Sequence, residues 1–157
     1  MSRRETIIMT EAEQAALIRA SRVAQVATIG PNGRPHLVPL WFTPRGIGLA
    51  TWTYASSQKA ANLRRLPEAT VLFEAGDTYE QLRGVSMECD VELVEDPERV
   101  AAIGQEVMLR YAGGEPGEEV SVAASQFVRV QAAKRVGLVC TPTKVVSWDH
   151  AKLGGTY

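Results

Sequence analysis

Strand-like segments joined by short turns constrain the fold of this chain more than any other feature. Residues 22–30 (RVAQVATIG) alternate with a period of two, as a strand with one buried face does. The turn PNGRP follows, and its Asn32-Gly33 pair is the strongest short signal for a β-hairpin. Residues 36–43 (HLVPLWFT) form the return strand, and residues 47–54 (IGLATWTY) follow after another turn. We therefore expect these three segments to form a meander.

The rest of the chain adds strands and helices without a βαβ alternation. Further strands are expected at residues 69–75, 85–94 and 135–148. Helices are expected at residues 10–21, 56–67, 95–111 and 118–134. About six strands and four helices, with the strands clustered in hairpins, predict an α+β architecture: an antiparallel barrel or sheet with helices at its ends. No linker or repeat divides the chain, so we expect one domain over residues 1–157.

Composition excludes several classes of function. The 157 residues are 45% apolar and 22% charged, with a formal net charge of −1, so no basic field for nucleic acid is present. No run of apolar residues is long enough to predict a membrane span. The first residues lack the pattern of a signal peptide, so the expected location is cytoplasmic. Cys89 and Cys140 form no CxxC pair and are expected to be buried, reduced thiols.

The stretch SSQKAANLRRLP, residues 56–67, has an unusual charge at its start. Lys59 lies in the expected first turn, which carries no acidic residue, although the positive end of the helix dipole disfavours a cation there. Backbone N–H groups, two serine hydroxyls and an ammonium group at one helix end suit an anion, above all a phosphate. Asn62 shares a face with Lys59. From spacing alone, a solvated lysine on a surface helix remains the alternative.

A second candidate region is the strand that contains His36, Pro39 and Trp41. Pro39 interrupts the hydrogen-bond ladder, and Trp41 follows two residues later on the same face, so a planar ligand could lie along this backbone. The alternative is a core tryptophan and a surface histidine. Lys134 and Arg135, at a helix–strand junction, offer either another anion contact or ordinary stabilisation of a helix end.

The residues alone do not decide the role of two further segments, a loop and the C-terminal tail. The loop GDTYEQLRG, with Asp77 and Tyr79, covers a pocket or simply connects two strands. The tail SWDHAKLGGTY contains Trp148, Asp149 and His150, which a disordered chain end does not need. It is therefore expected to dock across a pocket or a dimer interface. Ser147, Asp149 and His150 have no elbow motif and do not predict a hydrolase triad. Two histidines far apart in sequence define no metal site.

Taken together, these segments resemble the pyridoxamine-phosphate-oxidase-like split barrels, and within them the actinobacterial flavin/deazaflavin oxidoreductases of the B branch. The resemblance covers nearly the whole chain. It rests on the following stretches: VATIGPNGRPHLVPLWF, SQKAANLRRLP, DTYEQLRGVSMEC, KRVGL and SWDHAKLGG. The pattern S-x-K-x-x-N-L-x-x-x-P is its most specific part.

The resemblance implies a six-stranded antiparallel split β-barrel that forms a homodimer, with two cofactor sites at the interface. It implies coenzyme F-420 as the cofactor, used in reduced form, with FMN as the alternative. A non-catalytic F-420 or tetrapyrrole carrier is a further alternative. The substrate would be a planar conjugated small molecule such as an enone, quinone or bilin, and no catalytic side chain is assigned beyond His36 as a possible proton donor.

Position by position, the resemblance assigns roles to residues of this chain. Ser57, Gln58 and Lys59 would hold the cofactor phosphate, supported by Thr53 and Asn62. The ring system would lie against the strand with His36, Pro39 and Trp41. Lys134 and Arg135 would reach the phosphate or the acidic tail of the cofactor, and Asp77 and Tyr79 would close the site from the partner subunit.

Two departures from the family pattern leave the identity of the cofactor undecided. Related proteins often carry Arg or Lys at the position of Ser57, so phosphate binding here would rest more on Lys59 and backbone N–H groups. Pro39 and Trp41 replace the polar residues usual on the strand that lines the ring.

Overall fold

A computed structural model describes residues 3–115 and 117–154 of the chain. Its helices are α1 (Arg3–Thr6), α2 (Glu11–Ala20), α3 (Gln58–Arg65), α4 (Pro97–Ala112) and α5 (Val122–Ala132), with short 3₁₀ helices η1 (Tyr79–Gln81) and η2 (His150–Leu153). Its strands are β1 (Ala24–Ile29), β2 (Pro35–Leu40), β3 (Thr43–Arg45), β4 (Gly48–Tyr54), β5 (Glu68–Ala75), β6 (Arg83–Val94) and β7 (Arg135–Asp149).

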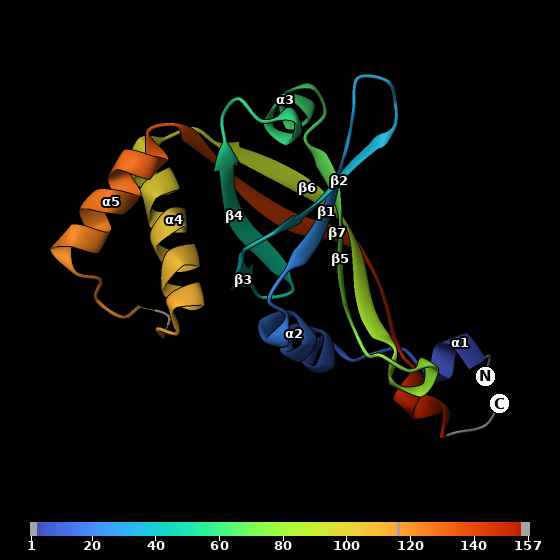
Figure 1. Cartoon of the computed structure of the whole chain (residues 1–157). Helices are drawn as coiled ribbons and strands as arrows, with labels where there is room; N and C mark the ends of the chain where they lie inside the picture. Colours follow the sequence, from blue (N-terminus) through green and yellow to red (C-terminus); the bar gives the residue numbers. More distant parts are fainter. Residues whose placement is uncertain (1–2, 116, 155–157) are drawn as a thin grey trace.

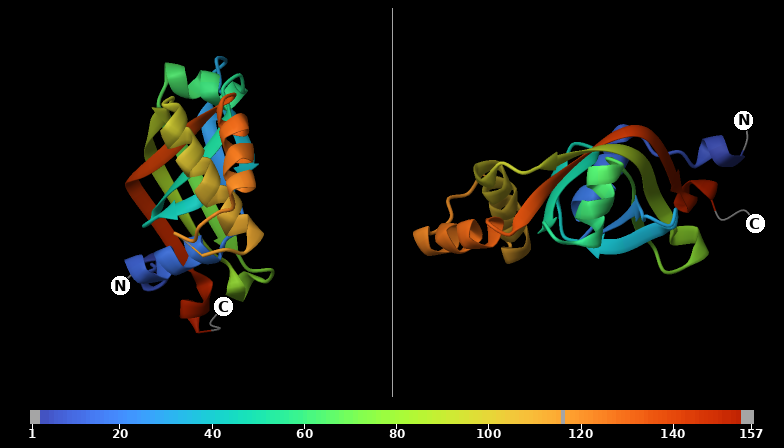
Figure 2. Two further views of the ribbon diagram at one scale, coloured as in Figure 1. Left: turned by 90° about the vertical axis from the view of Figure 1, so that its left-hand side faces the viewer. Right: turned by 90° about the horizontal axis from the view of Figure 1, so that it is seen from above.

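The strands form one antiparallel sheet in the order β2-β1-β5-β6-β7-β4-β3, which curls into a half-barrel (Figures 1 and 2). The predicted α+β class and antiparallel barrel are confirmed. The inner face is closed by large apolar side chains that are almost fully buried, among them Phe42, Leu49, Phe73 and Met87. The curled sheet therefore encloses the main core, and α3 covers one end of it.

The prediction of a three-stranded meander before α3 is wrong. β1 and β2 pair as the Asn32-Gly33 turn predicts, with Gly33 at φ 77°. The run HLVPLWFT, however, ends as a strand at Leu40, and the chain passes through Trp41 and Phe42 into the short strand β3. β3 pairs with β4, and β4 pairs with β7, so β2 and β3 lie at opposite ends of the strand order. This break also explains why the sheet has seven strands instead of six.

The strand order depends on two long strands, β6 and β7, which pair along most of their length. The register shifts between Glu88 and Cys89, opposite the region of Pro142. Pro142 has no N–H group to donate to the ladder, which accounts for an irregularity at this place. Pro142 therefore causes a local bulge inside one continuous strand.

Helix signals in the sequence locate the main helices well. Thr10 and Glu13 form the predicted capping box of α2, and Asp96 accepts the N-cap hydrogen bond of α4. α4 and α5 pack on each other beside β4 (Figure 1). Gly104 allows α4 to lie against β4, because a Cβ atom there would lie 2.3 Å from the indole ring of Trp52 in β4. Four-residue α1 and the 3₁₀ helices were not predicted, because so few residues carry no periodicity.

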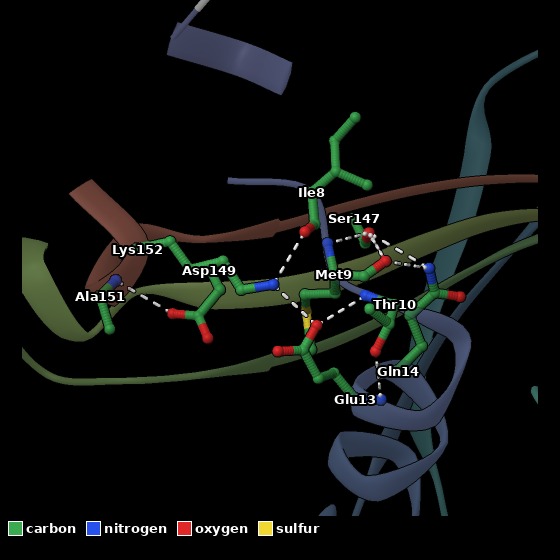
Figure 3. A network of polar contacts seen from close by, with 9 residues as sticks. All are labelled: Ile8, Met9, Thr10, Glu13, Gln14, Ser147, Asp149, Ala151 and Lys152. Carbon is green, nitrogen blue, oxygen red and sulfur yellow. Dashed lines mark hydrogen bonds and ion pairs between the residues drawn. The ribbon is translucent and has the colours of Figure 1, made fainter. Parts of the chain in front are cut away.

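The tail of the chain docks on the N-terminal segment of its own chain (Figure 3). Lys152 Nζ donates to the carbonyl of Ile8 at 2.9 Å and forms an ion pair with Glu13 at 2.7 Å. Ser147 Oγ accepts a hydrogen bond from the backbone N–H of Met9 at 3.1 Å. The tail was expected to dock across a pocket or a dimer interface. Within one chain it packs, as far as Gly154, on the N-terminal segment, and residues 155–157 lie outside the described part.

Candidate functional site

Hydroxyl groups and one ammonium group meet where β4 leads into α3. Ser57 is the N-cap of α3, and its Oγ accepts a hydrogen bond from the N–H of Ala60 at 3.3 Å. Lys59 Nζ donates to Thr53 Oγ1 at 2.9 Å, and Thr53 Oγ1 donates to Ser57 Oγ at 3.4 Å. Three predicted site residues are therefore in direct contact at the start of one helix.

Asn62 and Gln58 extend this group into the protein interior. Asn62 is 0% exposed, and its Nδ2 donates to Thr28 Oγ1 of β1 at 3.0 Å. Gln58 Nε2 donates to Asn62 Oδ1 at 2.8 Å. A buried polar group left without its partner costs about 1–3 kcal/mol, so this chain of bonds fixes the orientation of α3 on the barrel. We call Thr53, Ser57, Gln58, Lys59 and Asn62 the α3 cluster.

The charge of Lys59 is not balanced by a carboxylate. Among the described residues its ammonium is hydrogen-bonded to the neutral hydroxyl of Thr53, and partial burial lowers the pKa of Lys59 below its usual value. By contrast, Arg64 pairs with Glu95 at 3.2 Å, and Arg65 donates to the carbonyl of Ile29. Lys59 and Arg65 thus both lack a carboxylate partner among the described residues, and of the two Lys59 is the one in the first turn of α3, beside Ser57 and Thr53.

Of the predicted ring-lining residues, His36 lies nearest to the α3 cluster. His36 is opposite Thr28 in the β1–β2 ladder, and opposite residues of an antiparallel pair share a face of the sheet. Thr28 is the residue that Asn62 contacts, so His36 lies one ladder step from the cluster. Pro39, three residues further along β2, is on the other face and is exposed.

Trp41 lies beyond the end of β2 and has a different neighbour from the one the sequence suggested. Its ring stacks on Tyr111 of α4, with centroids 4.2 Å apart and planes 8° apart, and the residue is 55% exposed. Tyr111 in turn donates through its hydroxyl to the carbonyl of Arg22 at 2.6 Å. The alternative of a core tryptophan is therefore wrong, and Trp41 offers an accessible aromatic surface.

Lys134 and Arg135 lie next to the α3 end of the molecule. The carbonyl of Lys134 accepts a hydrogen bond from Ala55, three residues after Trp52 on the chain that leads into α3, at 3.0 Å. The guanidinium of Arg135 stacks on the rings of Tyr54 and Trp52, 4.2 and 4.7 Å from their centroids, and donates to Gln131. Arg135 is thus held by packing, whereas the side chain of Lys134 is exposed.

Asp77 and Tyr79 are not brought to the α3 cluster within one chain. They lie in the turn between β5 and β6, at the end of the molecule near the chain termini, while α3 covers the other end (Figure 1). The ring of Tyr79 packs against His150, with centroids 4.4 Å apart, and His150 Nδ1 lies 2.9 Å from the Tyr79 carbonyl. This loop can meet an α3 cluster only through a second copy of the chain.

The other side chains that could take part in chemistry do not form a catalytic or metal site among the described residues. Asp149 Oδ1 accepts from the N–H of Ala151, and His150 faces Tyr79, so neither forms a triad with Ser147. Cys89 and Cys140 are free and buried as predicted, and burial raises their pKa values to about 11 and about 12. No group of three or more His, Cys, Asp or Glu side chains in the described part is arranged to hold a metal ion. Nor is any described helix long and apolar enough to cross a membrane.

Two residues of this region have no signal in the sequence. Thr28 supports Asn62 across 34 positions of sequence, and Tyr111 supports Trp41 from a helix 70 positions away. Thr28 is part of an ordinary alternating strand, and Tyr111 lies near the end of an amphipathic helix. Only the folded arrangement identifies them as supports of the predicted residues.

Comparison with known proteins agrees with this fold. The sequence profile of the pyridoxamine 5'-phosphate oxidase family matches residues 10–148. A solved structure from Mycobacterium tuberculosis, described as the conserved hypothetical protein Rv2991, is 41% identical, and the match covers 100% of this chain and 95% of that one with a TM-score of 0.88. No curated protein sequence matches the chain.

Two more distant structures share the fold. One, named an F420 reductase, is 24% identical over 83% of this chain and 93% of its own, with a TM-score of 0.62. The other, the haem storage protein HutZ of Vibrio cholerae, is 16% identical over 88% and 96%, with a TM-score of 0.65. The profile match and the similarity to Rv2991 each extend over most of the chain. The chain therefore belongs to the pyridoxamine 5'-phosphate oxidase family.

Proposed function

We propose that this protein is an oxidoreductase that uses coenzyme F-420 to reduce a planar conjugated small molecule, with the cofactor phosphate held at the start of α3. The observation that carries the proposal is the charge of Lys59, which lies at a helix N-terminus and has one hydrogen-bond partner among the described residues, the neutral hydroxyl of Thr53, and no carboxylate partner. Membership of the family and the similarity to a structure named an F420 reductase support it.

The donors of the α3 cluster fit a phosphate group. The N–H of Ala60 is taken up by Ser57, whereas those of Gln58 and Lys59 are not used by hydrogen bonds within the described residues. Two amides, the Lys59 ammonium and the Ser57 hydroxyl are the donors that phosphate sites at helix starts use. The absence of an acidic residue in this first turn removes the repulsion that a phosphate would otherwise meet.

Reduced F-420, when bound, supplies the hydride that the reaction transfers. The protein binds and orients the cofactor and shields the reaction from water. Lys59 and the amides of α3 fix one end of the cofactor, and the Asn62–Thr28 bond holds α3 in place for this. His36, half-buried one ladder step away, is our candidate for giving a proton to the substrate.

The site is completed in a homodimer. Asp77 and Tyr79 lie at the end of the chain opposite α3, so they contribute to a site only when a second copy brings them there. The outward face of β1 and β2 is suited to this contact because it exposes Leu37 and Ile29. The reaction would take place in the cytoplasm, where free buried thiols are ordinary.

The test is a titration of the purified protein with F-420 and FMN side by side, followed by fluorescence. We expect saturable binding of F-420, weaker binding of FMN, and turnover with at least one member of a panel of enones, quinones and bilins. A yellow protein that retains FMN would favour the FMN-dependent oxidoreductase instead. Tight binding of F-420 without turnover of any member of the panel would favour a cofactor carrier.

A further inference from the structure

A hollow of about 760 Å³ lies on the side of the molecule where α2, β3 and the C-terminal half of α4 meet. In Figure 1, α2, β3 and α4 lie away from α3, and no member of the α3 cluster lines the hollow. Its volume is within the range of about 300–1,000 Å³ that small-molecule sites occupy. It is thus large enough to be a ligand site, and it is separate from the proposed cofactor site.

The hollow is lined by more positive than negative groups. Four arginines line it, against two glutamates, Glu106 and Glu115. Arg45 is paired with Glu106 at 2.6 Å. The other three arginines (Arg19, Arg22 and Arg110) have no ion pair with a carboxylate in the described part of the chain. An excess of unpaired guanidinium groups in a concave site attracts an anion.

Two of these arginines, Arg22 and Arg110, are held in place by the surrounding structure. Arg110 Nη2 donates to the carbonyls of Arg19 and Ser21 at 3.0 and 2.8 Å, which joins α4 to the end of α2. The guanidinium of Arg22 lies 4.6 Å from the centre of the Tyr111 ring. Positioned guanidinium groups lose less freedom on binding and form paired hydrogen bonds with carboxylate or phosphate oxygens.

Part of the remaining wall is apolar, a surface that an inorganic ion alone would leave uncovered. Ala20, Pro44 and Leu109 contribute hydrocarbon surface beside the arginines. Combined with the volume, this surface fits a molecule that has an apolar body and an acidic group. We propose that the hollow is a second ligand site, distinct from the cofactor site, that binds a small aromatic or aliphatic organic anion through Arg19 and Arg22.

The test uses 2-naphthoate and 1-naphthyl phosphate as probes, with inorganic phosphate as the probe that lacks the apolar body. Binding is measured by calorimetry and by the emission of Trp41, which stacks on the same Tyr111 ring that Arg22 covers. We expect both naphthyl anions to bind saturably and to change Trp41 emission, and the stronger of the two identifies carboxylate or phosphate as the preferred head group. Trp41→Phe should remove the emission change but keep the heat of binding.

Substitutions locate the probe. Arg22→Gln should weaken binding about tenfold or more, the effect of losing one charge-assisted hydrogen bond. Arg19 is an exposed arginine of the same hollow with no packing role. If Arg22→Gln lowers stability, Arg19→Gln therefore tests whether the probe binds in the hollow. Arg34→Gln, at the tip of the β1–β2 hairpin, removes the same charge far from the hollow and should leave binding unchanged.

Several results would overturn the proposal. These are no saturable binding of either naphthyl anion, binding that both hollow variants leave unchanged, and inorganic phosphate binding as tightly as the naphthyl anions. Each titration is repeated with saturating F-420, and loss of binding by competition would show that the hollow belongs to the cofactor site. Failure of F-420 itself to bind would contradict the proposed function and leave this second site standing.

Discussion

Lys59 occupies the second position of α3, where a cation opposes the helix dipole by about 0.3–1 kcal/mol. The start of α2 carries Glu11 and Glu13, and that of α4 carries Glu98, so the charge at α3 is the exception in this chain. Partial burial lowers the pKa of Lys59, and its ammonium has no carboxylate partner among the described residues. Lys59 lowers the stability of the free protein, and its presence is explained if it binds an anion at the start of α3.

The first prediction concerns Lys59→Met. We expect the free energy of unfolding of the free protein to change by no more than about 1 kcal/mol, because the lost hydrogen bond to Thr53 is offset by removal of a cation from the helix start. Affinity for F-420 should fall about tenfold or more, since the phosphate loses a charge-assisted bond. Chemical denaturation and fluorescence titration measure the two effects.

Lys144→Met is the matched control, because Lys144 is an exposed lysine on β7 paired with Glu88. It should leave F-420 affinity unchanged. The affinity of the native protein should also decrease as pH rises through the lowered pKa of Lys59, because the phosphate then loses its cationic partner. An affinity that Lys59→Met leaves intact contradicts the role given to this residue.

At the scale of elements, one ion pair, between Lys152 and Glu13, adds to the hydrogen bonds that join the tail to the N-terminal segment. Lys152 lowers the pKa of Glu13 from 4.5 to about 2, and the N–H of Thr10 acts in the same direction. Since the pKa of this carboxyl is lower in the folded state, its stabilisation is complete above pH 4.5 and is lost as pH falls towards 2. The docking of η2 beside α2 is therefore expected to weaken in acid.

Lys152→Met should raise the pKa of Glu13 towards its ordinary value, although the bond from Thr10 remains. Carboxyl NMR titration measures this shift directly, and Trp148 emission reports on the nearby tail, which should loosen at neutral pH in the variant. Lys144→Met, which removes the ion pair between β7 and Glu88 of β6, should leave both signals unchanged. A titration midpoint of Glu13 that Lys152→Met does not move would show that the ion pair is absent in solution.

The sequence predicts elements where local signals exist and fails where distant contacts decide. Neighbouring residues alone determine three features: the capping box of α2, the N-cap Asp96 and the Asn32-Gly33 turn. These features are therefore predicted correctly. The partner of β4 is chosen by pairing with β7, more than eighty positions later, and no local pattern shows this. The start of α3 was recognised through its charge and its family pattern, whereas its support by Thr28 was not.

For the whole molecule, the α3 cluster and the loop of Asp77 and Tyr79 lie at opposite ends of the barrel (Figure 2). A site that uses both requires two chains. Leu37, 63% exposed on the outward face of β2, lies opposite Ala27, which lines a hollow of about 420 Å³ on the same face. A solvent-exposed apolar strand at the edge of a sheet is normally covered in the assembled protein.

We therefore predict a dimer by light scattering after size exclusion. Leu37→Glu should convert it into a monomer and weaken F-420 binding, because an unpaired charge is costly in an apolar contact. Val122→Glu makes the same change on α5, at a residue 75% exposed and outside the proposed contact, and should leave the dimer intact. A native protein with the mass of one chain contradicts the two-chain site.

The most direct measurement is a crystal structure of the protein with F-420 bound. We expect the cofactor phosphate within hydrogen-bond distance of Lys59 Nζ and of the N–H groups of Gln58 and Lys59. We also expect the ring system along β2 near His36, with Asp77 and Tyr79 of a second copy closing the site. A phosphate bound elsewhere, for example at the arginine-lined hollow between α2 and α4, would contradict this expectation.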